Sequence, residues 1–174
     1  KKPLGMVDII DVGLRSSYVA SYYAAPLLAQ TPGSLVVFTS SFGADCYMHG
    51  PAYGAQKAGG DKMAADMALD FREDDVAAVS IWMGLLKTER TADITEDTKP
   101  DYAAFLANAE TPEFTGDLIL ALHDSDQRMA LSGQTLIGAE LGQLLGVTDR
   151  DGRQPMSYRG MLGQPPERSK AVVR

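Results

Sequence analysis

The strongest constraint on the fold is an apolar run, a helical repeat and a second apolar run that follow one another along the chain. The first run, near Leu35 to Thr39, ends in small polar residues, as a buried parallel strand does where it opens into a loop. The second run, Val76 to Trp82, also ends in a loop that contains glycine. Between them, from Ala52 to Phe71, small or apolar residues recur with helical spacing. This succession predicts an α/β arrangement.

Tyr53 and Lys57 stand in the first turns of the predicted helix, four residues apart. At this spacing the phenol and the ammonium group lie on one helix face and can point into the same pocket. An unperturbed tyrosine titrates near pH ~10, and a neighbouring cation lowers that pKa. The spacing by itself often arises by chance on amphipathic surfaces. Its place after a strand end that carries hydroxyl groups makes the pair a predicted proton-transfer site.

Several motifs in the order of a known family extend this pattern from about Asp8 to about Gly152. They are Val12 to Arg15, the Ser40-Ser41 strand end, Tyr53-Gly54-Ala55-Gln56-Lys57-Ala58, Gly84 with Thr88, Thr111-Pro112-Glu113 and Ala130 to Gln134. With these motifs the chain resembles the carboxyl-terminal portion of a classical short-chain dehydrogenase/reductase. Gly13 and the segment Gly146 to Gly152 are similar to the branch of dehydrogenase/reductase family member 1.

The resemblance implies a role for each matching residue. Tyr53 would be the general acid/base at the substrate carbonyl or hydroxyl, and Lys57 would lower the pKa of its phenol and bind the nicotinamide ribose. Ser41 would hold the substrate oxygen. Ser40 is the competing candidate, because the interval from Ser41 to Tyr53 is one residue shorter than in many members. Adjacent strand residues point to opposite faces, so only one serine can serve.

The loop after the second strand and the first helix depart from the family pattern. Gly84 and Thr88 stand where the family has P-G-x-x-x-T, with Met83 in place of the proline. Gly84 would let the backbone approach the nicotinamide amide. Thr88 would bind the cofactor or serve as an ordinary helix N-cap. Gly13 stands where many members carry an asparagine that closes a proton relay to the lysine, so that relay is either absent or rebuilt.

No glycine-rich phosphate-binding turn stands between a strand and a helix in these 174 residues. We therefore expect a partial Rossmann-type, doubly wound parallel sheet in three αβα layers. Residues 1–152 would form the catalytic half, without the N-terminal cofactor-binding half, and the strand near Ser40 would be an uncovered edge. Residues 153–174 contain few apolar side chains and are expected to form a loosely attached tail.

Composition excludes several other classes of protein. The net charge of -7 argues against a nucleic-acid partner, and no apolar run is long enough to span a membrane. The single cysteine, Cys46, excludes an intramolecular disulfide and suits the cytoplasm. His49 and His123 are far apart and flanked by no second ligand, so no metal site is expected. A serine hydrolase with Ser41 as nucleophile lacks the G-x-S-x-G elbow.

The resemblance implies an oxidoreductase that transfers hydride between NAD or NADP and a small carbonyl or alcohol substrate. It also implies a homodimer or homotetramer and a substrate-covering lid between Thr88 and Pro112. One alternative is a non-catalytic scaffold that kept the fold but lost activity. Another is the related group of epimerases and dehydratases, which share Y-x-x-x-K; the Gly84/Thr88 loop and Ser132-Gly133 favour the dehydrogenases over it.

Overall fold

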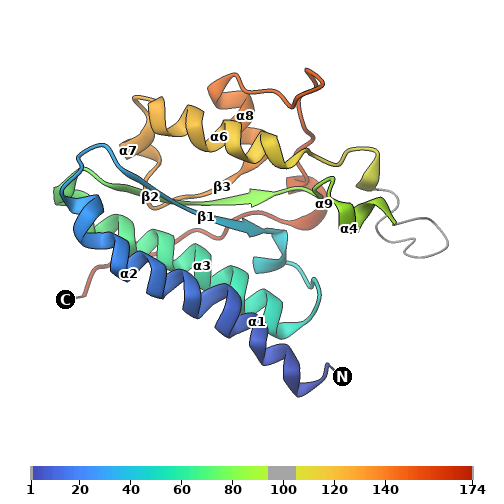
Figure 1. Ribbon diagram of the computed structural model, residues 1–174, viewed down its shortest axis with the longest axis horizontal. Helices are drawn as coiled ribbons and strands as arrows, with labels where there is room; N and C mark the ends of the chain where they lie inside the picture. Colours follow the sequence, from blue (N-terminus) through green and yellow to red (C-terminus); the bar gives the residue numbers. More distant parts are fainter. Residues whose placement is uncertain (1, 94–104, 174) are drawn as a thin grey trace.

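A three-stranded parallel sheet forms the middle layer of the computed structural model, which describes residues 2–93 and 105–173 (Figure 1). Its strands are β1 (Leu35–Ser41), β2 (Ala77–Met83) and β3 (Thr135–Ile137), hydrogen-bonded in the order β1-β2-β3. Ser41 lies opposite Met83, so β1 and β2 end at the same edge of the sheet. The prediction of a parallel α/β sheet, with strands near Leu35 to Thr39 and Val76 to Trp82, is confirmed.

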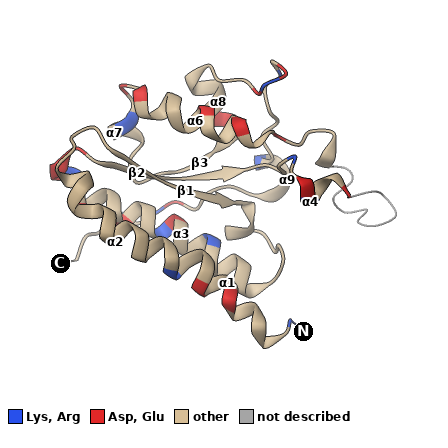
Figure 2. Cartoon of the chain, viewed as in Figure 1, with Lys and Arg blue, Asp and Glu red and all other residues tan. Residues whose placement is uncertain are grey.

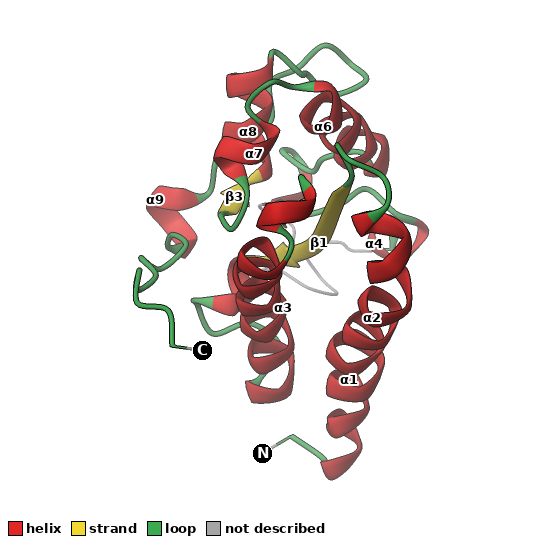
Figure 3. Cartoon of the chain, turned by 90° about the vertical axis from the view of Figure 1, so that its left-hand side faces the viewer, coloured by secondary structure: helices red, strands yellow, loops and turns green. Residues whose placement is uncertain are grey.

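Helices cover both faces of the sheet. On one face lie α2 (Ser16–Ala29) and α3 (Pro51–Asp70), which run side by side (Figures 1 and 3). On the other face lie α6 (Pro112–Asp124) and α8 (Gly138–Leu145). The short helices η3 (Phe42–Ala44), η4 (Arg72–Asp74), α4 (Glu89–Ala92), α7 (Arg128–Leu131) and α9 (Arg159–Leu162) complete the elements named here. The three-layer αβα arrangement is therefore present.

The core is centred on β2, in which all seven residues are buried. Because side chains alternate along a strand, its two faces bury different sets. Val79, Ile81 and Met83 pack against α6 and α8, where Phe114, Leu118 and Leu122 recur every four residues. Trp82 faces the other way. This alternation leaves Ser80 and Trp82 facing α3, which carries the candidate catalytic residues.

The helical stretch before β1 is built from four successive segments. These are the 3-10 helix η1 (Leu4–Val7), α1 (Asp8–Ile10), the π-helical segment η2 (Asp11–Arg15) and α2, which contains Pro26. No charged residue occurs in α2, as Figure 2 shows. The three tyrosines of α2, Tyr18, Tyr22 and Tyr23, are all exposed.

The expectation of a loose tail from residue 153 onward does not hold for the first part of that segment. The Arg153 guanidinium donates hydrogen bonds to the carbonyl oxygens of Ala107 and Ala109, at 3.0 and 2.9 Å. Tyr158 is buried, with its ring 6.2 Å from that of Phe42. One aromatic anchor and a few polar side chains that satisfy backbone carbonyls are enough to dock a segment with few apolar residues.

Two other expectations concern surfaces of the molecule. β1 lies at the edge of the sheet, and no described strand pairs with its outer side. A cleft of about 470 Å³ opens there between α2, β1 and α3.

Residues 94–104, the middle of the expected lid, lie outside the described residues. Within the described ranges, no helix has the length and apolar character needed to cross a bilayer.

Candidate active site

The end of β1 meets the start of α3, and this contact brings Ser41 and Tyr53 together. The Ser41 Oγ lies 2.9 Å from the Tyr53 hydroxyl oxygen. Helix α3 can begin here because Pro51 occupies its first turn and Gly50, with φ of 105°, turns the chain into it. A Cβ at Gly43 would lie 2.5 Å from the Tyr53 ring, so only glycine lets the ring lie against this backbone.

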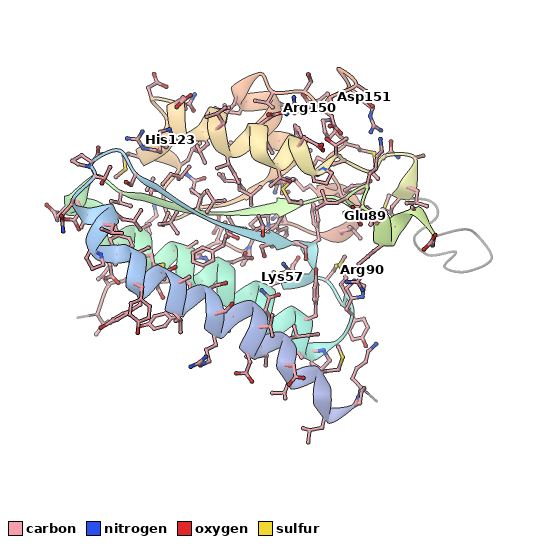
Figure 4. The ribbon with its side chains drawn as sticks, in the orientation of Figure 1. Lys57, Glu89, Arg90, His123, Arg150 and Asp151 are labelled. Atoms are coloured by element: carbon pink, nitrogen blue, oxygen red, sulfur yellow. The ribbon has the colours of Figure 1, made fainter. Side chains whose placement is uncertain are left out.

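Lys57 lies one turn after Tyr53 on α3, as predicted. Its Nζ donates a hydrogen bond to the Thr39 carbonyl oxygen at 3.2 Å and lies 5.6 Å from the centre of the Tyr53 ring. Figure 4 places the side chain between α3 and the sheet. Burial lowers the pKa of Lys57, and the negative charge of Asp61 acts in the opposite direction. An ammonium group and a phenol hydroxyl thus share one site.

The two serines at the end of β1 have different partners. Ser41 contacts the Tyr53 hydroxyl and also accepts a hydrogen bond from the Gly43 N–H at 3.2 Å. Ser40 is buried, and its Oγ donates to the Lys57 carbonyl oxygen at 3.4 Å. The geometry therefore favours Ser41 over Ser40 as the serine that shares a substrate oxygen with Tyr53.

Gly84 and Thr88 follow β2 at the same edge of the sheet, but their contacts differ from the expected ones. The Gly84 N–H donates to the Glu110 carboxylate at 3.1 Å, and a Cβ at Gly84 would lie 2.7 Å from its Oε1. Glycine is thus required here by a packed carboxylate. Thr88 is the N-cap residue of α4, and its N–H donates to the Thr91 Oγ1 at 2.8 Å. Of the two roles considered for Thr88, the structure shows the N-cap.

Gly13 contacts the side chain of Gln56, to which the sequence motifs assigned no role. The Gln56 Nε2 donates to the Gly13 carbonyl oxygen at 3.3 Å, and a Cβ at Gly13 would lie 2.7 Å from the Gln56 Cγ. Gly13 lies in the π-helical segment η2, and Gln56 precedes Lys57 on α3. The space beside Gly13 is therefore filled by an amide from the catalytic helix. Gly13, Gln56 and Lys57 together line the cleft beside β1.

Two buried carboxylates lie near the site, and the sequence motifs gave no role to either of them. Asp61 and Glu110 are each only 1% exposed. Asp61 accepts hydrogen bonds from the Ser80 Oγ at 2.6 Å and the Trp82 Nε1 at 2.8 Å. Burial raises the pKa of Asp61, and raises the pKa of Glu110 to about 7. A sequence signal existed for Asp61, because it falls on the buried stripe of small residues that runs through Gly60, Ala64 and Ala68.

Of the other candidate groups, His123 is remote from Tyr53, whereas His49 packs against its ring. His123 pairs with Asp124 at 2.8 Å on the exposed end of α6 (Figure 4). The His49 ring meets the Tyr53 ring edge-on, with 4.9 Å between centroids. Burial raises the pKa of the Cys46 thiol. Among residues 2–93 and 105–173, no group of three or more His, Cys, Asp or Glu side chains is placed to hold a metal ion.

Comparison with known proteins adds evidence independent of this geometry. The family model described as short chain dehydrogenase matches residues 5–99. The chain is similar to the protein named dehydrogenase/reductase SDR family member 1 from two species, mouse and human. The mouse protein is 36% identical over 162 residues, and the human protein is 34% identical over 158 residues. Each alignment covers 87% of this chain and 50% of the relative, so the chain spans about half the length of these relatives.

Solved structures with the same fold are more distant in sequence. A 3-oxoacyl-[acyl-carrier protein] reductase from Brucella melitensis is 18% identical, with a TM-score of 0.67 over 79% of this chain and 52% of that one. A 4-hydroxyisoleucine dehydrogenase mutant, complexed with NADH and succinate, is 22% identical with a TM-score of 0.62, over 76% and 56% of the two chains. At these identities the likeness shows the fold alone.

The sequence motifs, the fold and the relatives agree. The family model covers more than half of the chain, and it includes the strand end with Ser41 and the helix with Tyr53 and Lys57. The relatives from mouse and human carry the name of the branch that Gly13 and the segment Gly146 to Gly152 indicated. The chain therefore belongs to the short-chain dehydrogenase/reductase family.

Proposed function

We propose that this chain carries the catalytic residues of an NAD(P)-dependent oxidoreductase that interconverts a carbonyl group and an alcohol. The observation that supports this most directly is the 2.9 Å contact between the Ser41 Oγ and the Tyr53 hydroxyl, with Lys57 one helical turn away. Two hydroxyl groups that converge on one point can both bind a substrate oxygen, and one of them can exchange a proton with it. A non-catalytic scaffold would have no need of this arrangement.

Each residue has one task in the proposed reaction. A bound nicotinamide cofactor would supply or accept the hydride. When a carbonyl is reduced, the Tyr53 phenol donates its proton to the carbonyl oxygen, and the Ser41 hydroxyl holds that oxygen in place. The Lys57 ammonium then stabilises the phenolate that remains. When an alcohol is oxidised, the same groups act in reverse, and the phenolate takes the hydroxyl proton.

The fit of this site to a nicotinamide cofactor is partial. Lys57 has an ammonium group beside Tyr53 and can donate to ribose hydroxyl groups, so we propose both residues as cofactor contacts. The Gly84 N–H already donates to Glu110, so the loop Gly84 to Thr88 would offer the cofactor its other backbone groups or the Thr88 hydroxyl. We propose that the phosphates are held by residues in the half of the relatives that this chain does not span. NAD and NADP remain equal candidates.

We also propose a homodimer or homotetramer in the cytoplasm. The uncharged outer face of α2, with the exposed side chains of Tyr18, Tyr22, Tyr23 and Leu27, supports self-association. The unpaired Cys46 suits a reducing compartment. Sedimentation of the purified protein would test the assembly. A single monomeric species at all concentrations would contradict it.

The test of the proposed function is turnover of a panel of aldehydes, ketones and alcohols with NADH, NADPH and their oxidised forms. It is made on the 174-residue chain and on the longest polypeptide that its coding sequence encodes. Tyr53→Phe should lower turnover roughly 10²–10⁴-fold, because it removes the proton that general acid catalysis supplies. Tyr47→Phe is the matched control, since Tyr47 is 84% exposed in the loop that precedes α3. Equal turnover by wild type and Tyr53→Phe would refute the assignment.

A further inference from the structure

Asp61 has surroundings that are unusual for an ionisable group. It lies on α3 and is 1% exposed, yet both of its carboxylate oxygens are engaged. The Ser80 hydroxyl donates to Oδ1 at 2.6 Å, and the Trp82 indole donates to Oδ2 at 2.8 Å. The Ser40 side chain also acts on this carboxyl group and lowers its pKa. An indole N–H can only donate, so the group that it meets must present an acceptor.

Asp61 and these partners come from three secondary-structure elements. Ser40 belongs to β1, Ser80 and Trp82 to β2, and Asp61 to the helix packed against both strands. The carboxylate therefore joins the catalytic helix to the ends of two strands. Ser40 and Trp82 are opposite each other in the strand register, so these contacts converge beside Ser41. Asp61 thus contacts the sheet next to the strand end that carries Ser41.

Asp61 is also one helical turn after Lys57, just as Lys57 is one turn after Tyr53. Residues at this spacing share a helix face, so phenol, ammonium and carboxylate form a row along α3. The charge of Asp61 raises the pKa of Lys57 against the effect of burial. The positive charge of Arg168, in the carboxyl-terminal segment, lowers the pKa of Asp61. Asp61 is therefore coupled to the proposed catalytic lysine as well as to the sheet.

We propose that Asp61 is a positioning residue, and that its buried carboxylate is the counter-charge that keeps Lys57 in the ammonium form. Hydrogen bonds from Ser80 and Trp82 favour the ionised carboxylate, because they replace part of the hydration lost on burial, and Ser40 also lowers the pKa of this group. The effect on turnover rests on the function proposed above. The effect on the ionisation of Lys57 does not, so the two can fail separately.

Asp61→Asn removes the charge and can keep the hydrogen bonds. The amide oxygen can accept from Trp82, and the amide nitrogen can donate to the Ser80 hydroxyl. Ser80 can in turn donate to the Phe38 carbonyl oxygen, which lies 3.4 Å from its Oγ. The matched control is Asp66→Asn on the same helix, where the side chain is 55% exposed and paired with Lys62.

The first measurement is the ionisation of Lys57, followed by NMR of ¹³C-methylated lysines and assigned with Lys57→Arg. We expect the pKa of Lys57 to fall in Asp61→Asn and to stay unchanged in Asp66→Asn. An unchanged pKa in Asp61→Asn would overturn the proposal. In the longest encoded polypeptide, kcat of Asp61→Asn should begin to fall at a lower pH than kcat of the wild type, while KM stays within about twofold.

A second measurement needs no substitution at Asp61. Trp82 is the only tryptophan in the chain, and its indole donates to this carboxylate, so its fluorescence reports the ionisation of Asp61. We expect a fluorescence step at a pH below the titration of Lys57. If the carboxyl group keeps its proton until Lys57 has lost its own, Asp61 is no counter-charge and the proposal is wrong. Neither readout depends on turnover, so a failed Tyr53→Phe test leaves both intact.

Discussion

The end of β2 is flanked by two buried carboxylates that differ in their hydrogen-bond partners. Asp61, on the α3 side, accepts hydrogen bonds from the side chains of Ser80 and Trp82, and Ser40 also lowers its pKa. Glu110, beyond the strand end, receives one backbone N–H, from Gly84. Burial raises the pKa of both, and that of Glu110 reaches about 7. Both carboxyl groups are equally buried, so the difference in pKa follows from their hydrogen-bond donors. Donors that contact a carboxylate stabilise its ionised form and limit the rise in pKa that burial causes.

Neighbouring charges increase the difference in pKa between Glu110 and Asp61. Asp149 lies near Glu110 and raises its pKa further, while Arg153 lowers it. The buried Tyr158 hydroxyl has no hydrogen-bond partner among the described residues. The backbone of Glu110 exchanges two hydrogen bonds of 2.7 Å with Leu85 and Lys87. Glu110 thus fixes the loop after β2, whereas Asp61 fixes the catalytic helix.

The largest effect is expected from Asp61→Ala. Truncation removes the acceptor and leaves the Trp82 N–H and the Ser80 hydroxyl buried without it. We expect the free energy of unfolding to fall by about 3–5 kcal/mol, measured by urea denaturation followed by circular dichroism. Asp66→Ala, at an exposed position on the same helix, should change it by less than about 1 kcal/mol. Equal losses of unfolding free energy at the two positions would show that the buried hydrogen bonds of Asp61 add no more stability than an exposed ion pair does.

Glu110→Gln tests the other carboxylate through pH. The folded pKa of about 7 lies above the ordinary value of 4.5, so the folded chain binds this proton more tightly than the unfolded chain. The stabilisation from Glu110 is therefore complete below pH 4.5 and is lost as the pH rises through 7. Over this range the wild type should lose about 3 kcal/mol of unfolding free energy through Glu110. Glu110→Gln should remove that loss.

The measurement is urea denaturation at a series of pH values from 4 to 9, with Glu113→Gln as the control. Glu113 is exposed in the first turn of α6, so its neutralisation should leave the pH dependence as in the wild type. If the unfolding free energy of Glu110→Gln still falls with pH as in the wild type, other groups cause that pH dependence. Glu110 would then resemble Asp61, and the contrast between the two carboxylates would be lost.

The smallest effect is expected from Gly84→Ala, which probes how firmly Glu110 is held. The new Cβ would lie 2.7 Å from the Glu110 Oε1 and 3.2 Å from the Tyr158 ring, so a buried group must shift. We expect a loss of about 1–3 kcal/mol in unfolding free energy. Gly116→Ala on α6 is the control: its Cβ meets nothing within 4 Å, and the helix should gain up to about 1 kcal/mol. A neutral Gly84→Ala would mean that Glu110 moves freely.

Much of the fold could be predicted from local patterns. The strand at Val76 to Trp82 was expected one residue early and the helix at Ala52 to Phe71 one residue late, as hydrophobic periodicity allows. The preference for Ser41 over Ser40 rested on the resemblance, because alternation along a strand shows only that the two residues point to different faces. The hydroxyl contact between Ser41 and Tyr53 depends on the path of residues 42–50, which no periodic pattern describes.

The sequence by itself determined the α/β class, the family and the spacing of Ser41, Tyr53 and Lys57. These follow from period and order along the chain, which local physics converts into strands, helices and helix faces. Only the tertiary structure decided that Asp61 meets Trp82 and that Glu110 meets Gly84. Each of these pairs is separated by 21 or 26 residues, and a charged residue in a sequence does not reveal whether donors elsewhere will surround it when it is buried.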